Sequence, residues 1–86
     1  MRSGESPNID DEPQPLVLLP VGGHARIVEI RGGRQLSRRL LGLGLRVGVE
    51  LDLLHRRGRG VVVGRSGIRV ALGAGVAEKV YVLPLD

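Results

Sequence analysis

The sequence contains no cysteine, no phenylalanine and no tryptophan, and Tyr81 is its one aromatic residue. Without cysteine the chain can form neither a disulfide nor a thiolate metal site, which fits a reducing compartment. No apolar run approaches the roughly 20 residues of a membrane-spanning helix, and the first 15 residues lack the apolar centre of a signal peptide. We therefore expect a soluble, cytoplasmic protein with no direct membrane insertion.

Aliphatic residues are abundant and replace the missing aromatics, with 14 Leu, 12 Val and 4 Ile among 86 residues. This length suits one small domain with a modest aliphatic core. Residues 1–15 differ in composition, because they combine prolines with four acidic side chains and few apolar ones. We expect residues 1–15 to be a disordered, acidic, proline-rich tail and residues 16–86 to form the domain.

Charge is divided unevenly between these two parts. Residues 1–12 carry a net charge of −3, whereas residues 13–86 hold 12 basic and 5 acidic side chains, a net charge of +7. Twelve of the 13 basic residues in the chain are arginines, whose planar guanidinium groups suit carboxylates and phosphates. The composition predicts a basic domain surface that the acidic segment could screen.

The stretch before Gly44 predicts a short amphipathic helix. Leu36, Leu40 and Leu43 recur at positions i, i+4 and i+7, so they share one face of that helix. Gly44 falls where a residue just past a helix adopts the left-handed conformation. Leu45 then packs back on Leu40 in a Schellman cap.

From Val47 the apolar period changes to two, which predicts a half-buried strand over 47–54 with Val47, Val49, Leu51 and Leu53 facing inward. The other expected elements are an extended entry at 16–19, a strand at 24–31 with a bulge near Val28 or Glu29, a loop at 55–60, strands at 61–63, 68–72 and 79–83, and a helical turn at 73–78. Five or six short strands with glycine-rich turns and one short helix predict a mostly β fold, a small closed barrel.

Several short motifs occur in a fixed order over about residues 16–84. They are Leu19-Pro20 followed by Gly22, Ala25, Ile27 and Ile30, then Arg39-Leu40, Leu43-Gly44 and Gly48, and finally Ala71-Leu72 with Ala77, Val80 and Val82. This pattern resembles the FeoA family. The resemblance implies an SH3-like barrel that acts with FeoB, a membrane permease for ferrous iron whose cytoplasmic part includes a G-protein-like GTPase domain.

The sequence lacks the motifs of common catalytic sites. It has no GxxxxGK[ST] phosphate-binding loop and no cysteine nucleophile, and neither Ser37 nor Ser66 has a sequence sign of a His or acid partner. A barrel this small also leaves little room for a dry, preorganised cleft. We expect no enzymatic activity and no required cofactor.

Four residues of metal-ligating type, His24, Glu50, Asp52 and His55, are spread over two segments. The side chains of Asp52 and His55 leave opposite faces of a regular strand, and Glu50 with Asp52 is a carboxylate pair without nitrogen. No complete site is visible in one chain. We expect these residues to hold Zn or Fe only as an adventitious metal, or as one bridging two copies in a homodimer.

The partner-binding surface is expected at Arg34, Arg38, Arg39, Leu41, Arg56, Arg57 and Arg59. Leu41 lies off the core stripe, so its side chain either contacts a partner or caps the barrel rim. Because three of the arginines share one glycine-flanked loop, a sharper hypothesis is that Arg56, Arg57 or Arg59 approaches the bound nucleotide of the permease as an arginine finger.

Taken with the resemblance, these residues predict a non-catalytic accessory protein that binds the FeoB permease and modulates transport or GTP hydrolysis. With Tyr81 as the one aromatic side chain, the chain lacks the aromatic groove that holds proline-rich peptides and the aromatic platforms that stack bases. Nucleic acid is therefore not the expected partner. The basic charge is the one feature that favours nucleic-acid binding. A nucleic-acid-binding barrel and a homo-oligomeric scaffold are the alternative functions.

Overall fold

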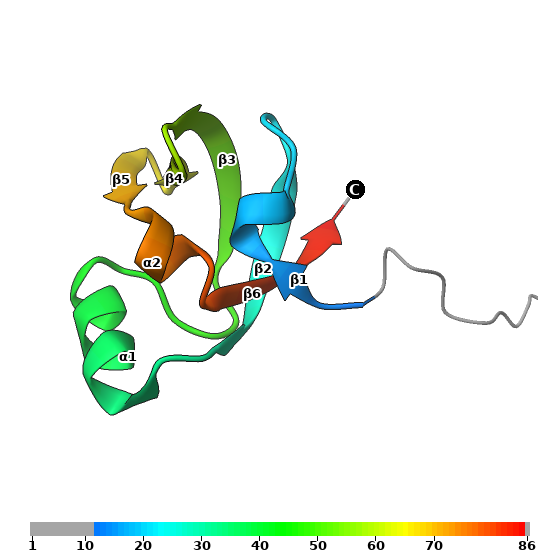
Figure 1. The fold of residues 1–86 in the computed structure, drawn as a ribbon. Coiled ribbons are helices and arrows are strands. Elements are labelled where there is room, and N and C mark those ends of the chain that lie inside the picture. Colours follow the sequence, from blue (N-terminus) through cyan, green and yellow to red (C-terminus); the bar gives the residue numbers. More distant parts are fainter. Residues whose placement is uncertain (1–11, 86) are drawn as a thin grey trace, which may run out of the picture.

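Six antiparallel strands form one strongly curved sheet in the computed structural model, which describes residues 12–85 (Figure 1). The strands are β1 (Gln14–Pro15), β2 (His24–Ile30), β3 (Glu50–Arg57), β4 (Gly60–Arg65), β5 (Ile68–Leu72) and β6 (Val80–Leu85). The helices are the 3₁₀ helix η2 (Leu16–Leu18), α1 (Gly33–Gly42) and the single turn α2 (Ala74–Ala77). A mostly β fold with one short helix is thus confirmed, including the strands and the helical turn expected after residue 60.

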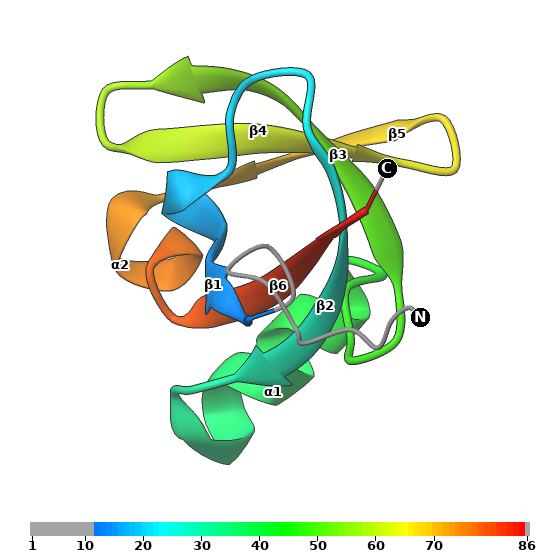
Figure 2. The same ribbon diagram turned by 90° about the vertical axis from the view of Figure 1, so that its right-hand side faces the viewer.

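The strands follow the order β1-β6-β2-β3-β4-β5, so β1 and β5 are the two edges of the sheet. The sheet curls around an apolar interior, and α1, which connects β2 to β3 in the chain, lies at one end of the sheet (Figure 2). Hydrogen bonds do not join β1 to β5, so the curled sheet is not closed into a complete ring as the sequence had suggested.

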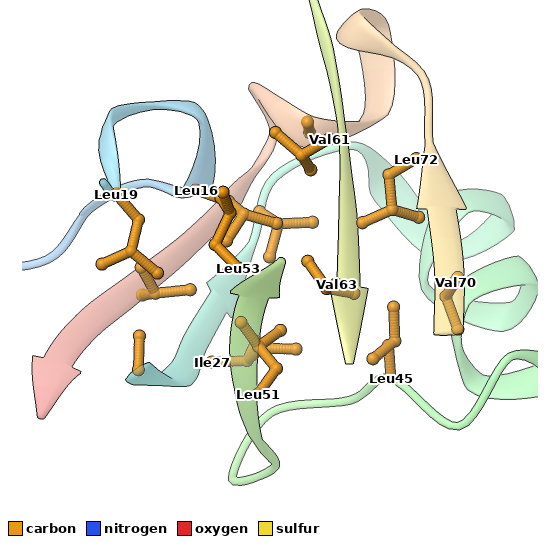
Figure 3. Packing of buried hydrophobic residues seen from close by; sticks show 14 of the residues in the cluster. Leu16, Leu19, Ile27, Leu45, Leu51, Leu53, Val61, Val63, Val70 and Leu72 are labelled. Atoms are coloured by element: carbon orange, nitrogen blue, oxygen red, sulfur yellow. The ribbon is translucent and has the colours of Figure 1, made fainter. Parts of the chain in front are cut away.

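The interior of the curled sheet is filled by aliphatic side chains (Figure 3). Ile27 on β2, Leu51 and Leu53 on β3, and Val61 and Val63 on β4 are at most 1% exposed. These residues alternate with exposed ones along β2 and β3, as a half-buried strand requires. The expected aliphatic core is confirmed.

The end of α1 has the predicted glycine cap. Gly44 has a φ of +84°, its N–H donates to the carbonyl of Leu41 at 2.9 Å, and the N–H of Leu45 donates to that of Leu40 at 2.8 Å. These are the two hydrogen bonds of a Schellman motif. Leu43 was wrongly expected on the buried stripe: the helix ends at Gly42, so Leu43 already belongs to the cap and is 46% exposed.

The bulge expected in the strand after residue 24 is also present. The pairing of β2 with β6 shifts between Ile27 and Glu29, which leaves Val28 as the extra residue. A bulge changes the inward parity of a strand, so Ile27 is fully buried and Ile30 still packs against the core.

The sequence predicts an extended segment at 16–19. This prediction is wrong, because these residues form a turn of 3₁₀ helix. The N–H of Leu19 donates to the carbonyl of Leu16 at 3.0 Å. Because residues three apart share one side of a 3₁₀ helix, both leucines enter the core, where they are 0% and 1% exposed. Of the expected disordered tail, residues 1–11 lie outside the described residues, and Gln14–Pro15 form β1 against β6.

The strand expected at 47–54 starts and ends later than predicted. Gly48 has a φ of +98°, and Val47 beside it is 56% exposed rather than buried. The strand β3 runs on to Arg57, which pairs with Gly60 across a two-residue turn. The loop expected at 55–60 is therefore wrong, because its first residues belong to a hairpin.

Candidate partner-binding surface and histidine–carboxylate cluster

Four charged side chains form a cluster on the outer face of β2 and β3. The register pairs His24 with Asp52 and Arg26 with Glu50, so all four side chains leave the sheet on the same side. His24 Nδ1 lies 2.6 Å from Asp52 Oδ1 and its Nε2 lies 2.9 Å from Glu50 Oε1. The guanidinium of Arg26 donates to the other oxygen of Glu50 at 3.0 Å.

The contacts of this cluster favour the protonated form of His24. A neutral imidazole carries one N–H, whereas here both ring nitrogens face carboxylates, and both can donate only in the imidazolium. The hydrogen bonds to Glu50 and then to Asp52 raise the pKa of His24. In return, the bonds from His24 and Arg26 lower the pKa of Glu50. Each of these surface groups thus stabilises the charged form of its partner.

Three of the four expected metal ligands thus come together, but their geometry does not suit one ion. A metal ligand needs a free nitrogen lone pair, and the two nitrogens of His24 point at different carboxylates. His55 is exposed, further along β3, and has no hydrogen bond to the other three. Within residues 12–85 no group of three His, Asp or Glu residues is arranged to hold a metal ion.

A shallow groove of about 430 Å³ runs beside α1, and we call it the α1 groove. Its lining residues are Ile30, Arg34, Ser37, Arg38, Leu41, Arg46 and Val47. Leu41 and Val47 are each 56% exposed, although neither carries charge. Residues 34, 38 and 41 share one face of the helix because they are four and three apart. The predicted residues Arg34, Arg38 and Leu41 therefore form one surface.

The other predicted arginines lie elsewhere. Arg39 is exposed on α1 but does not line the α1 groove. Arg57 and Arg59 lie at the far end of β3, beside α2, where they line a separate hollow of about 350 Å³. Since eight residues of strand span about 23 Å, the end of β3 that turns into β4 lies well away from α1 (Figure 2). The single surface expected from the sequence is divided into two.

Arg56 bonds within the chain. Its guanidinium donates to the carbonyls of Val17 and Leu19, each at 2.7 Å. These carbonyls belong to η2 and the residue that follows it, so Arg56 ties the short 3₁₀ turn to β3. Positioning of η2 is the contribution that these contacts indicate for Arg56.

Sequence reasoning missed four residues of the α1 groove, namely Ile30, Ser37, Arg46 and Val47. Val47 was assigned to the core because it continues the alternation of the strand that follows. The available signal was Gly48, since glycine is the residue that readily adopts the positive φ of the turn found there. Because the chain turns here, the side chain of Val47 lines the groove and does not enter the core.

A model of the FeoA domain matches residues 14–84. The chain belongs to the FeoA family. It is similar to the crystal structure of an iron uptake regulatory protein (FeoA), with a TM-score of 0.79 and 30% identity over 86% of this chain and 99% of that one. It is also similar to the solution structure of the FeoA protein from Chlorobium tepidum, with a TM-score of 0.76 and 27% identity over 85% and 71% of the two chains.

These FeoA-family structures confirm the SH3-like barrel. A manganese-dependent transcriptional repressor shares the fold, with a TM-score of 0.78 and 22% identity over 85% of this chain and 41% of the repressor. A search of curated proteins gives no match. In the described part of this FeoA-family chain, no helix has the length and apolarity needed to cross a membrane.

Proposed function

We propose that this chain is a non-catalytic accessory protein of ferrous iron uptake that binds a FeoB-type permease on its cytoplasmic side and modulates transport or GTP hydrolysis. Membership of the FeoA family implies the accessory role in ferrous iron transport. The contact with the permease is our inference, and the α1 groove is the observation that supports it.

The α1 groove combines the two features of a binding surface. Its apolar side chains, including Leu41 and Val47, remain half exposed to water, which favours their burial against a partner. Arg34, Arg38 and Arg46 flank them, and no ion pair joins these arginines to any residue between 12 and 85. Arginine and apolar anchors are typical of interface centres, so the groove suits a partner surface that is apolar and acidic.

The titratable groups support a non-catalytic role. The closest set, His24 with Glu50 and Asp52, lies open to water with side-chain exposures of 38%, 46% and 54%. Its proton donors and acceptors are occupied by one another. General acid–base catalysis instead needs a group that is free to exchange a proton with a substrate, and it is aided by a site that excludes water.

The proposed function requires no cofactor. A divalent ion that bridged two copies through His24 would first have to displace the proton that His24 shares with Asp52 or Glu50. The expected consequence is that metal and proton compete. Light scattering with and without Zn or Fe tests whether such a bridge joins two copies.

The arginine-finger hypothesis is now confined to Arg57 and Arg59, because the guanidinium of Arg56 is bonded to η2 and its neighbour. An arginine finger raises GTP hydrolysis by about 10³-fold or more. GTPase rates of the permease domain, measured with the wild type and with Arg57→Ala and Arg59→Ala, test it. Identical rates would rule out this mechanism.

The docking proposal is tested with two exposed leucines that differ in position. Leu41 lines the α1 groove, whereas Leu18 is 63% exposed on η2 and does not line it. We expect Leu41→Asp to weaken binding to the isolated cytoplasmic part of a FeoB-type permease by about tenfold or more, and Leu18→Asp to leave it unchanged. Calorimetric titration measures both affinities.

Circular dichroism melting serves as the folding control, since both side chains are already exposed and neither change should lower the melting temperature much. Equal affinity for Leu41→Asp and the wild type, or an equal loss for both variants, would contradict docking through the α1 groove.

A further inference from the structure

One edge of the sheet is an open strand of five residues. β5 pairs with β4 through a two-residue turn at Ser66 and Gly67, which have φ values of +51° and +80°. Positive φ at both turn residues is the mark of a type I′ hairpin. As the last strand in the sheet order, β5 has a neighbouring strand on one side only within residues 12–85.

The register of this hairpin shows which backbone groups face outward. The pair that closes a two-residue hairpin is hydrogen-bonded, and bonded pairs alternate with unbonded ones. Arg65 pairs with Ile68 at the turn, so residues 68, 70 and 72 bond to β4. The N–H and C=O groups of Arg69 and Ala71 therefore point away from it, and no backbone hydrogen bond joins them to another described segment.

Two hollows lie along this edge. The first, of about 500 Å³, separates β5 from the cap of α1, and its walls include Leu43 and Ile68, which are 46% and 62% exposed. The second is the hollow beside α2, which Ala71 and Leu72 share with Arg57 and Arg59. An extended segment laid along β5 would follow both hollows in turn.

The charges around β5 indicate what kind of segment would bind to this edge of the sheet. Among residues 12–85, the charged side chains that line the two hollows are Arg57, Arg59 and Arg69, with no acidic one. Arg65 adds a fourth guanidinium at the start of the hairpin turn, close to Gly44 of the α1 cap. A second copy would bring the same arginines against these, and like charges across paired strands are destabilising. An acidic segment of another protein is favoured instead.

We propose that β5 receives an extended acidic segment of a partner protein as an added strand. Its backbone pairs with the outward N–H and C=O groups of Arg69 and Ala71, as in β-strand addition. Because strand side chains alternate, acidic side chains of the segment meet the arginines while apolar ones cover Leu43 and Ile68. The α1 groove does not include these β5 residues, so this site is separate from the proposed permease contact.

Hydrogen exchange of the β5 amides tests the added strand. The probe is a capped eight-residue peptide in which glutamate alternates with valine or threonine. In the free protein the amides of Arg69 and Ala71 should exchange faster than those of Val70 and Leu72, which bond to β4. Saturating peptide should slow exchange at residues 69 and 71 by at least about tenfold. The same peptide with lysine in place of glutamate should have no effect.

A matched pair of variants at one position separates backbone pairing from other binding. Ala71→Pro removes an N–H that β4 does not use, and proline is tolerated at such edge positions. Ala71→Val introduces a side chain similar in size to that of proline but keeps the N–H. We expect Ala71→Pro to weaken peptide binding by about tenfold relative to Ala71→Val, while slow exchange at Val70 and Leu72 reports that the hairpin remains folded.

Three results would overturn the proposal. The first is unchanged exchange at Arg69 and Ala71 with saturating peptide. The second is equal peptide affinity for the two variants at position 71. The third is protection of the same amides that grows with protein concentration without peptide, because it would make a second copy the occupant. Leu41→Asp tests binding of the permease at the α1 groove, and it changes no residue of the two hollows beside β5. Its result therefore does not alter the three measurements above, so this proposal and the proposed function can fail independently.

Discussion

Two faces of this small barrel use charged side chains in different ways. On the outer face of β2 and β3, His24 and Arg26 bond to Glu50 and Asp52, which balances two positive charges against two negative ones. At the α1 groove, three arginines lie beside exposed apolar side chains, and no acidic side chain of the part that the structure describes lines the groove. Both faces are rich in charge, but only the second leaves its charges available to a partner.

This difference shows that the pairing of charges, more than their number, marks an interaction surface. Exposed ion pairs within one chain contribute little to stability, yet they neutralise the field of the surface on which they lie. Arginines that form no ion pair with the described residues retain that field, which steers an acidic partner and speeds its encounter. The difference between charged side chains that bond within the chain and those that do not can be tested in three ways.

The largest expected effect comes from reversing the charge of the α1 groove. The double change Arg34→Glu and Arg38→Glu should weaken binding to the cytoplasmic part of a FeoB-type permease by about a hundredfold. Asp52→Asn, which disturbs the balanced face, should change the affinity by less than about twofold. Arg39→Glu is the control on the same helix, since Arg39 lies outside the groove. A larger loss for Asp52→Asn than for the double variant would reverse the comparison.

A smaller effect on folding distinguishes an arginine that bonds within the chain from one that does not. Arg56→Ala removes two hydrogen bonds of 2.7 Å to the backbone around η2, so the free energy of unfolding should fall by about 1–2 kcal/mol. Arg57→Ala, one residue further along β3, should change it by less than about 0.5 kcal/mol. Urea denaturation measures both values. Equal values for the two variants would show that the contacts of Arg56 do not stabilise η2.

The smallest effect concerns pH. The raised pKa of His24 means that its charge stabilises the fold fully below its ordinary pKa of 6.5, and that this stabilisation is lost as the pH rises through the raised value. The lowered pKa of Glu50 has the opposite sign: its contribution is complete above its ordinary 4.5 and is lost as the pH falls through the lowered value. The cluster therefore stabilises most between pH 4.5 and 6.5.

Thermal melting of the wild type and His24→Gln measures this effect. The difference in melting temperature should be largest in that pH window and should shrink as the pH rises through the raised pKa of His24. It should stay small throughout, because the side chains are largely exposed and solvent screens their charges. His55→Gln is the matched control with no expected difference. A difference that grows with rising pH would contradict the assignment of a protonated His24.

Features encoded by a few neighbouring residues could be predicted from the sequence. The cap at Gly44 depends on one glycine and the leucines around it, and the bulge at Val28 follows from the spacing of Ile27 and Ile30. The turn at Gly48 was missed because a period of two looks the same with or without a change in φ at one glycine. Apolar alternation therefore located the strand but misplaced its first residue.

The candidate surfaces depend on contacts between distant segments, which sequence spacing does not reveal. His24 meets Asp52 through the register of β2 and β3, 28 residues apart in the chain. The α1 groove needs Ile30 before the helix and Val47 after it to lie on the same side of α1. Its helical half could be predicted from residues 34, 38 and 41, because that half is a local pattern.

The most direct test of the docking surface is a titration of the isotope-labelled chain with the cytoplasmic part of a FeoB-type permease, followed by NMR amide shifts. If the permease docks in the α1 groove, the largest shifts fall on α1 and on the turn at Val47 and Gly48, with little change at His24 and Asp52. Shifts concentrated on the outer face of β2 and β3, with none along the α1 groove, would contradict it.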